Sequence, residues 1–133
     1  MDRLSSKVTD PVVKRFMEAD ALLRQVDGKD GAEFTAEARA CFFYIACCDG
    51  CFKSNMEQDL GLTVASGSRN TDLLSKHHRL KLPSGKPRPG LDLIRKERDN
   101  LDQRKTKLFL TIKGKKLIEK FKSILYGEDT NVG

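Results

Sequence analysis

The sequence predicts a mainly α-helical domain with one small β-hairpin, and three features between Ser54 and Gly114 support this prediction. In chain order they are a short helix that ends in a tight turn, a second helix, and a basic hairpin. Two helices joined by a short turn that contains glycine are typical of a helix-turn-helix. A hairpin after the second helix makes such a motif a winged one. We therefore expect a winged helix-turn-helix with about five to six helices and one wing.

The first helix of the motif is expected to begin at Ser54 and to end before Gly61. Ser54 and Glu57 have the spacing of a capping box, in which the hydroxyl and the carboxylate each accept a hydrogen bond from a backbone N–H. Gly61 allows the left-handed conformation in which helices commonly end. Thr63 is suited to cap the next helix, the candidate recognition helix, which we expect to continue to about His77.

The hairpin is expected to follow a loop over residues 80–89, because the prolines and glycine in that stretch disfavour any regular element. Residues 91–98 and 106–111 have the pattern of two strands, with a turn at 99–102 between them. The side chains expected to point inward are those of Leu91, Leu93, Leu108 and Leu110. For the loop over 80–89 two interpretations are open: its basic residues lie along a phosphate backbone, or it is a rigid spacer.

Three further helices complete the predicted domain. One spans residues 10–26 and begins with an Asp-Pro pair, which suits the first helical position. Thr35 caps a second helix, which is apolar on much of its circumference and therefore belongs in the core. Thr111 caps the last helix, whose apolar stripe runs over residues 112–125.

Composition indicates one soluble globular domain over residues 1–133. Hydrophobic residues make up 38% of the chain and charged residues 33%, which does not fit a disordered chain. No apolar run approaches the roughly 20 residues of a membrane span, and the first residues lack the apolar core of a signal peptide. We therefore expect a cytoplasmic protein without a membrane partner.

The net charge of +6 is concentrated in one part of the sequence. Residues 1–75 have a net charge of −3, residues 76–107 of +7 and residues 108–122 of +4. The positive charge therefore lies beside the candidate recognition helix. A basic stripe of this kind is typical of proteins that bind a polyanion; a solvated lysine-rich surface is the alternative.

Five short motifs, which occur in order over roughly half of the chain, resemble the MarR family of winged-helix regulators. They are Asp59-Leu60-Gly61-Leu62-Thr63, Ser68-Arg69, Gly90-Leu91-Asp92-Leu93-Ile94, Asp102-Gln103-Arg104 and Leu110-Thr111-Ile112-Lys113-Gly114. The Asp-x-Arg of the wing, followed closely by Leu-Thr-x-Lys-Gly, is the most specific of them. Residues 75–79 through 90–91 also resemble MarR-like proteins of phages and prophages, which implies a bacterial or phage-infected cell.

The residue types of the candidate recognition helix suit base recognition. Ser66, Ser68, Arg69 and Asn70 fall on or beside one face near its N-terminal half, the part that typically reaches base edges. Arg can pair with guanine and Asn with adenine, whereas hydroxyls bind phosphates or either base type. Arg69 has an alternative role in an ion pair with Asp72 within the helix. Gly67 is unusual in a helix and either admits a close contact or weakens the helix.

For the wing, the resemblance implies that Arg104 reaches DNA and that Asp102 orients it. A long cation at a hairpin tip also suits a narrow and negatively charged minor groove. The remaining candidates for phosphate contacts are Lys76, Arg95, Lys96, Arg98, Lys105 and Lys107. The alternative is a hairpin whose charges only protect a sheet edge.

Four cysteines lie within residues 41–51, and Cys48 and Cys51 form a Cys-x-x-Cys pair. A structural zinc site usually needs a second pair or suitably spaced histidines. His77 and His78 are adjacent and belong to another element, so we expect no metal and no cofactor. Cys48 and Cys51 are candidates for a redox switch, but small buried thiols on a core helix are the favoured interpretation.

The spacing of the polar residues predicts no catalytic arrangement, so we do not expect an enzyme. The favoured function is a sequence-specific regulator that binds double-stranded DNA through residues 54–111. The resemblance implies a homodimer formed by the terminal helices over 10–26 and 112–125. The alternative is a winged-helix module that binds another protein, RNA or single-stranded DNA.

Overall fold

The computed structural model describes residues 6–26, 33–81 and 83–127 and confirms the mainly α-helical winged helix-turn-helix. The described elements are α1 (Pro11–Arg24), α2 (Ala36–Cys47), β1 (Cys51–Phe52), α3 (Lys53–Leu60), α4 (Val64–Leu74), β2 (His77–Lys81), β3 (Pro87–Pro89), β4 (Ile94–Arg98), β5 (Thr106–Leu110) and α5 (Ile112–Tyr126). None of the described helices has the length and apolar character needed to cross a membrane.

Helix starts follow the predicted caps at four places. The Asp10 carboxylate accepts hydrogen bonds from the backbone N–H groups of the first turn of α1, at 3.0 and 2.9 Å. The hydroxyls of Thr35, Thr63 and Thr111 accept backbone N–H groups at the starts of α2, α4 and α5, at 3.2, 3.0 and 3.0 Å. Gly61 ends α3 with a φ of 68°, in the left-handed region. These helix boundaries are set by capping residues that are neighbours in the sequence, so they can be predicted from the sequence alone.

The capping box predicted at Ser54 is wrong. Helix α3 begins at Lys53, and Phe52 stands at its N-cap without a side-chain hydrogen bond. Strand β1 pairs with β5, with Phe52 opposite Lys107, so the chain passes from a strand directly into the helix. The start of α3 is therefore set by strand pairing, and Glu57 is buried instead of capping the helix.

Helix α4, the candidate recognition helix, is shorter than predicted and ends at Leu74, before His77. The following backbone turns back onto the end of the helix, where the Leu91 N–H donates to the Leu73 carbonyl at 2.8 Å and the Leu93 N–H to the Leu74 carbonyl at 2.8 Å. These bonds satisfy helix-end carbonyls that a longer helix would have used itself. His77 consequently begins strand β2.

The prediction of no regular element over residues 80–89 is also wrong, because β2 and β3 form a two-stranded antiparallel hairpin. Each of its strands has a neighbour on one side only. Proline is tolerated on such an edge, since its missing N–H can face away from the ladder. Pro87 and Pro89 therefore fit in β3, where a central strand would exclude them.

The three-stranded sheet has the order β1-β5-β4 and forms the predicted wing. Its register pairs Ile94 with Leu110 and Arg98 with Thr106. Strand β4 begins three residues later than the predicted residue 91, because residues 91–93 bond to the end of α4 and Asp92 has a φ of 57°. The four inward leucines, Leu91, Leu93, Leu108 and Leu110, are all buried as predicted.

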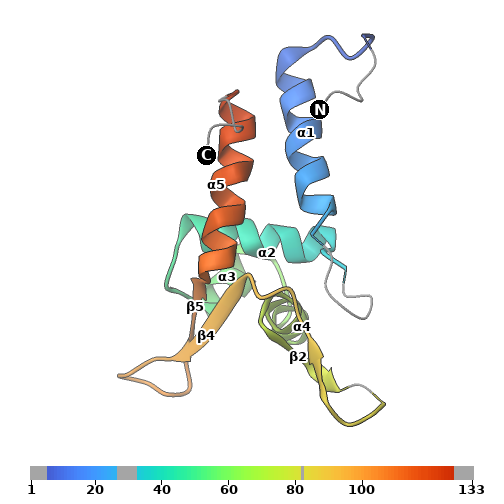
Figure 1. The fold of residues 1–133 in the computed structure, drawn as a ribbon. Helices are drawn as coiled ribbons and strands as arrows, with labels where there is room; N and C mark the ends of the chain where they lie inside the picture. Colours follow the sequence, from blue (N-terminus) through green and yellow to red (C-terminus); the bar gives the residue numbers. More distant parts are fainter. Residues whose placement is uncertain (1–5, 27–32, 82, 128–133) are drawn as a thin grey trace.

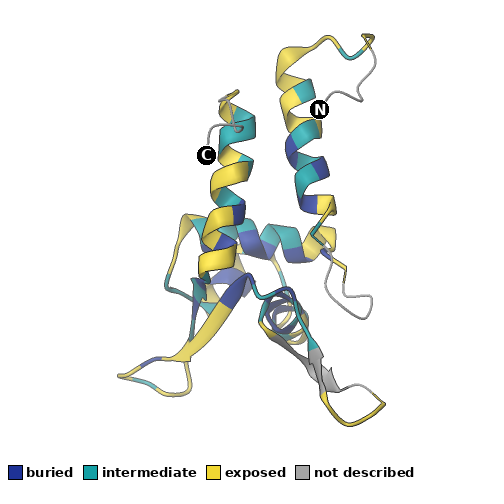
Figure 2. Ribbon diagram, viewed as in Figure 1, coloured by how far each residue is buried: buried dark blue, intermediate teal, exposed yellow. Residues whose placement is uncertain are grey.

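The core lies where α2, α4 and the sheet meet, and it is continuous with the bases of α1 and α5. Its largest fully buried side chains include Phe42, Ile45, Met56 and Leu74. Figure 1 shows α1 and α5 side by side on one side of this core, and the two hairpins projecting on the opposite side with α4 between them. Figure 2 shows that burial is concentrated around α2, α4 and the base of the wing, whereas the outer parts of α1 and α5 are exposed.

Candidate nucleic-acid interface

The solvent-exposed face of α4, called its outer face below, carries an arginine that is hydrogen-bonded to the first turn of the helix. The Arg69 guanidinium donates from Nη2 to Oγ of Ser66 at 3.0 Å, and Ser66 lies 3.1 Å from the hydroxyl of Thr63. Arg69 is exposed, and Ser66 and Ser68 are partly exposed. This chain of contacts directs the Arg69 side chain toward the N-terminal end of α4.

Asn70 does not share this face. It is only 7% exposed, and its amide nitrogen donates to Oε1 of Glu37 at 2.6 Å and to the Ser66 carbonyl at 2.8 Å. The bond to Glu37 connects α4 to α2. The prediction that Asn70 recognises adenine does not fit this placement, because its amide is already engaged inside the protein.

Two further residues on the outer face of α4 were not identified from the sequence. Val64 is 70% exposed at the first position of the helix, and Ala65 is exposed beside it. An exposed valine next to a cap looks like an ordinary surface residue in a sequence. Only the structure shows that Val64 and Ala65 are exposed near the N-terminal end of α4.

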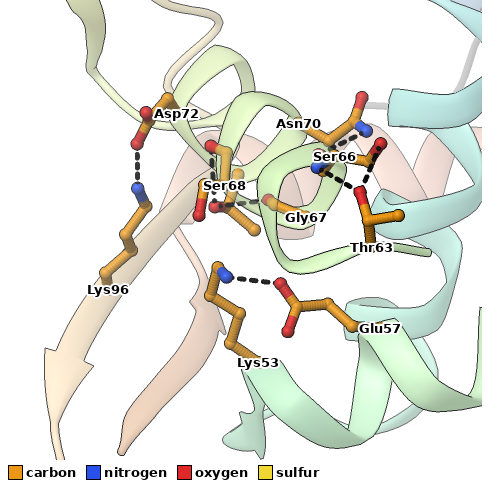
Figure 3. A network of polar contacts seen from close by, with 10 residues as sticks. Lys53, Glu57, Thr63, Ser66, Gly67, Ser68, Asn70, Asp72 and Lys96 are labelled. Carbon is orange, nitrogen blue, oxygen red and sulfur yellow. Dashed lines mark hydrogen bonds and ion pairs between the residues drawn. The ribbon is translucent and has the colours of Figure 1, made fainter. Parts of the chain in front are cut away.

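Gly67 seats α4 against α3. A Cβ atom at this position would lie 1.9 Å from Oε2 of Glu57 and 2.5 Å from its Cγ. The Glu57 carboxylate is buried and forms an ion pair with Lys53, one helical turn earlier in α3 (Figure 3). The close helix contact suggested for Gly67 is therefore present, and α4 is a complete helix through this position.

The wing is attached to α4 by an ion pair. Lys96 on β4 binds the carboxylate of Asp72 on α4 (Figure 3), and Asp72 is buried. The two elements therefore hold a defined relative position. Lys76, which follows α4, is exposed.

At the tip of the wing, one arginine is hydrogen-bonded to one aspartate. Nε of Arg104 lies 3.2 Å from Oδ1 of Asp102, which also accepts the Arg104 backbone N–H at 3.0 Å. These two hydrogen bonds, the side-chain one first, hold the pKa of the Asp102 carboxyl below its usual value. The Arg104 side chain is 92% exposed, so Asp102 orients a cation that remains in solvent.

The turn of the wing is organised by a second aspartate. Asp99 is buried, and its carboxylate accepts the Asp102 backbone N–H at 3.1 Å and lies 3.3 Å from Nζ of Lys107. Lys107 is thus partly neutralised within the wing. Leu101, also at the tip, is 96% exposed.

The remaining predicted cations lie on the sheet. The Arg95 guanidinium stacks 4.3 Å from the centre of the Phe109 ring, and Lys105 lies 5.2 Å from that of Phe52. Nη1 of Arg98 donates to the Gln103 carbonyl at 2.8 Å. The Arg95, Arg98 and Lys105 side chains are exposed, and Arg95 also forms an ion pair with Glu97.

The cysteines do not behave as one group. Cys41 is buried in the core as predicted, whereas Cys47 and Cys48 are exposed, so the core-thiol interpretation is wrong for these two. Burial, with a smaller contribution from nearby Cys48, raises the pKa of Cys51 to about 11. Within the described residues, no group of His, Cys, Asp and Glu side chains could hold a metal ion.

A raised pKa predicts slow reaction of Cys51 with oxidants, because the thiolate is the reactive form. At about pH 7.5, below the usual thiol pKa, we expect iodoacetamide to modify Cys48 before Cys51. For the DNA binding that the sequence predicts, we expect hydrogen peroxide to leave the affinity unchanged. Mass spectrometry of peptides and a gel shift with and without peroxide check this. Replacing both cysteines by serine is the control. Peroxide-dependent release that the double substitution abolishes would instead establish a redox switch.

Solved structures with the same fold include DNA complexes and a transcriptional regulator. The S. aureus MepR-DNA complex is 22% identical, with a TM-score of 0.63 over 86% of this chain and 78% of that one. A point mutant of S. aureus MepR bound to an oligodeoxyribonucleotide is 26% identical, with a TM-score of 0.59 over 86% and 70%. A MarR transcriptional regulator from Methanosarcina mazei Go1 is 15% identical, with a TM-score of 0.57 over 92% and 77%.

No protein-family profile and no curated protein matches the sequence. The likeness therefore rests on three-dimensional structure together with the motifs of the helix-turn-helix and wing. Two of these structures are described as complexes with DNA or an oligodeoxyribonucleotide, and one as a transcriptional regulator. The chain has the winged helix-turn-helix fold of the MarR-type transcriptional regulators.

Proposed function

We propose that this chain is a sequence-specific regulator of transcription that binds double-stranded DNA, with α4 in the major groove and the β4–β5 wing in the minor groove. One observation supports this above the others. Arg69 on α4 and Arg104 on the wing are each exposed and each held by a neighbouring side chain, on elements that the Lys96–Asp72 ion pair joins. Two oriented cations on rigidly linked elements suit a rigid duplex.

Each element has a distinct part in the proposed complex. Arg69 is the candidate for bidentate pairing with guanine, and the exposed methyl groups of Val64 are suited to contact with a thymine methyl. Arg104 is the candidate for the minor groove, where Leu101 would contact deoxyribose. Ser66, Ser68 and the exposed sheet cations would bind phosphates.

Single-stranded nucleic acid is a weaker candidate. Binding of single strands relies on aromatic side chains on which bases stack. The chain has no Trp, and the Phe52 and Phe109 rings of the sheet are covered by Lys105 and Arg95. These rings are therefore not open platforms.

The function is tested by a gel shift with three probes. The probes are a duplex selected by the protein from a random pool, one of its single strands, and an RNA duplex of the same sequence, each over a salt series. We expect tightest binding to the DNA duplex, with affinity that falls steeply as salt rises. Preference for RNA or for the single strand would support the alternative interaction module.

The proposal includes a homodimer built from α1 and α5. Four apolar side chains of α1 are exposed on one face: Val12, Val13, Phe16 and Met17. A contiguous exposed apolar face on a soluble domain commonly marks a protein interface. Two-fold symmetry would present two copies of α4 to half-sites about one helical turn apart.

Replacing Phe16 by Asp is expected to convert a dimer into a monomer and to weaken duplex binding, because a charge would be buried in the interface. Sedimentation at micromolar concentration measures the first effect and a gel shift the second. Thr9→Asp, which adds the same charge outside the apolar face, is the control and should leave the dimer intact. A wild-type protein that sediments as a monomer would contradict this part of the proposal.

A further inference from the structure

We propose that the β2–β3 hairpin is a second wing, which binds the phosphate backbone of the same DNA duplex on the side of α4 opposite the β4–β5 wing. The inference rests on the proposed function and extends it to a surface outside the recognition helix and the first wing. Placement, charge and stiffness of the hairpin support it independently.

The hairpin is fixed to the end of the recognition helix. The Gly90 N–H donates to the Lys76 carbonyl at 2.9 Å, and the Leu91 N–H to the Leu73 carbonyl at 2.8 Å. A Cβ atom on Gly90 would lie 1.9 Å from the Ser75 carbonyl oxygen, so the returning strand is in direct contact with the end of the helix. A ligand that positions α4 therefore also positions the hairpin.

The direction of the hairpin places it beside DNA. Figure 1 shows β2 and the chain that returns from it extending past α4 on one side, and the β4–β5 wing extending on the other. Both project away from α1 and α5. A helix that enters a major groove has a phosphate backbone on either side of it. The two hairpins accordingly flank α4 where those two backbones would run.

The charge of the hairpin is entirely positive. Residues 76–90 contain five basic residues, Lys76, Arg79, Lys81, Lys86 and Arg88, and no Asp or Glu. Lys76 and Lys86 are exposed. In the first wing, by contrast, Asp99 and Asp102 bind two of the cations. The second hairpin thus supplies positive charge without carboxylates of its own, which suits counterion release at phosphates.

The hairpin is also stiff. Pro83, Pro87 and Pro89 restrict its backbone, and Gly85 makes the tight turn at its tip with a φ of 83°. The residues of the tip, 83–86, are exposed and do not contribute to the core. A preorganised backbone loses less conformational freedom on binding than a flexible basic loop. Stiffness alone would also suit a rigid spacer, so the positive charge of the hairpin is what favours a contact element.

The test compares two triple variants with the wild-type protein. Lys81→Gln, Lys86→Gln and Arg88→Gln together remove charge from the hairpin. Lys116→Gln, Lys120→Gln and Lys122→Gln together remove the same charge from exposed positions on α5 and form the control. Affinity is measured over a salt series for a duplex that the wild-type protein selects from a random pool and for a scrambled duplex. Circular dichroism and sedimentation verify fold and oligomeric state.

The hairpin variant is expected to bind both duplexes more weakly by a similar factor and to lower the slope of log affinity against log salt by up to about three units per protomer. The α5 variant should keep the wild-type slope. A charge-preserving variant, Lys81→Arg, Lys86→Arg and Arg88→Lys, should bind like the wild type. Hydroxyl-radical footprinting should show that the hairpin variant loses protected phosphates outside the recognition site.

The outcomes separate this inference from the proposed function. If the folded hairpin variant keeps the wild-type slope and footprint while both proteins bind the duplex, the second wing is overturned and the proposed function stands. An equal loss of slope in the α5 variant would mean that only net charge matters, which also overturns it. If the wild-type protein binds no duplex, both proposals fail.

Discussion

Arg69→Ala is expected to weaken binding to a selected duplex by about 1–3 kcal/mol, and binding to a scrambled duplex by much less. The guanidinium lies exposed at the N-terminal half of α4 and is held by Ser66, so it is oriented before DNA arrives. In the proposed complex, its removal would take away a base contact and leave the phosphate contacts of both wings in place. Affinities for the two duplexes at one salt concentration measure the difference.

Arg104→Ala provides the contrast. Contacts from a hairpin tip are mainly to backbone and minor groove, so this variant should weaken selected and scrambled duplexes more nearly alike. Asp102→Ala should imitate it in part, because it removes the orienting carboxylate and leaves the cation. Arg24→Ala, on α1 and exposed, is the matched control. If Arg69→Ala and Arg104→Ala both left duplex binding intact in a folded protein, the proposed interface would be wrong.

Asn70→Ala, by contrast, is expected to reduce stability and not specificity. The side chain bridges α4 and α2, and its loss leaves the Glu37 carboxylate without that donor. We expect a loss of about 1–2 kcal/mol in the free energy of unfolding. The ratio of selected to scrambled binding should be unchanged. Urea unfolding measures the free energy of unfolding. A changed ratio of selected to scrambled binding would instead show that Asn70 contributes to DNA recognition.

Gly114→Ala is expected to lower the free energy of unfolding by about 1–3 kcal/mol. A Cβ atom at this position would lie 2.1 Å from the backbone carbonyl oxygen of Leu93. The same segment is fixed by the Thr111 N–H, which donates to the Leu93 carbonyl at 3.0 Å, and by the Thr111 hydroxyl, which donates to the Asp92 carbonyl at 2.7 Å. Neither backbone can move away without breaking these bonds.

Urea unfolding tests this expectation, with Lys115→Ala as the control at the neighbouring exposed position. Lys115→Ala should be nearly neutral. Equal unfolding midpoints for Gly114→Ala and the wild-type protein would show that α5 shifts freely against Leu93. The contact also gives a physical reason for the glycine that closes the Leu-Thr-x-Lys-Gly motif, since only a residue without a side chain fits there.

Side chains that act on their own backbone were predicted correctly from the sequence. Asp10, Thr35, Thr63 and Thr111 each accept a backbone N–H two or three residues away, and Gly61 ends its helix through its own φ. Such interactions need no distant partner, so the local sequence is sufficient to determine them. The charge distribution along the chain and the Asp102–Arg104 pair at the wing tip likewise depend only on residues that are close in the sequence.

Features that depend on distant partners were decided only by the tertiary structure. Because β1 pairs with β5, α3 begins at Lys53 and not at the predicted Ser54. Asn70 donates to Glu37 and therefore does not lie on the outer face of α4. Backbone N–H groups of residues 90–93 donate to carbonyls at the end of α4, so the helix ends at Leu74. The residues that follow form the β2–β3 hairpin. In each case a partner distant in sequence competes for the same hydrogen-bonding group, and sequence periodicity contains no information about which partner is nearer.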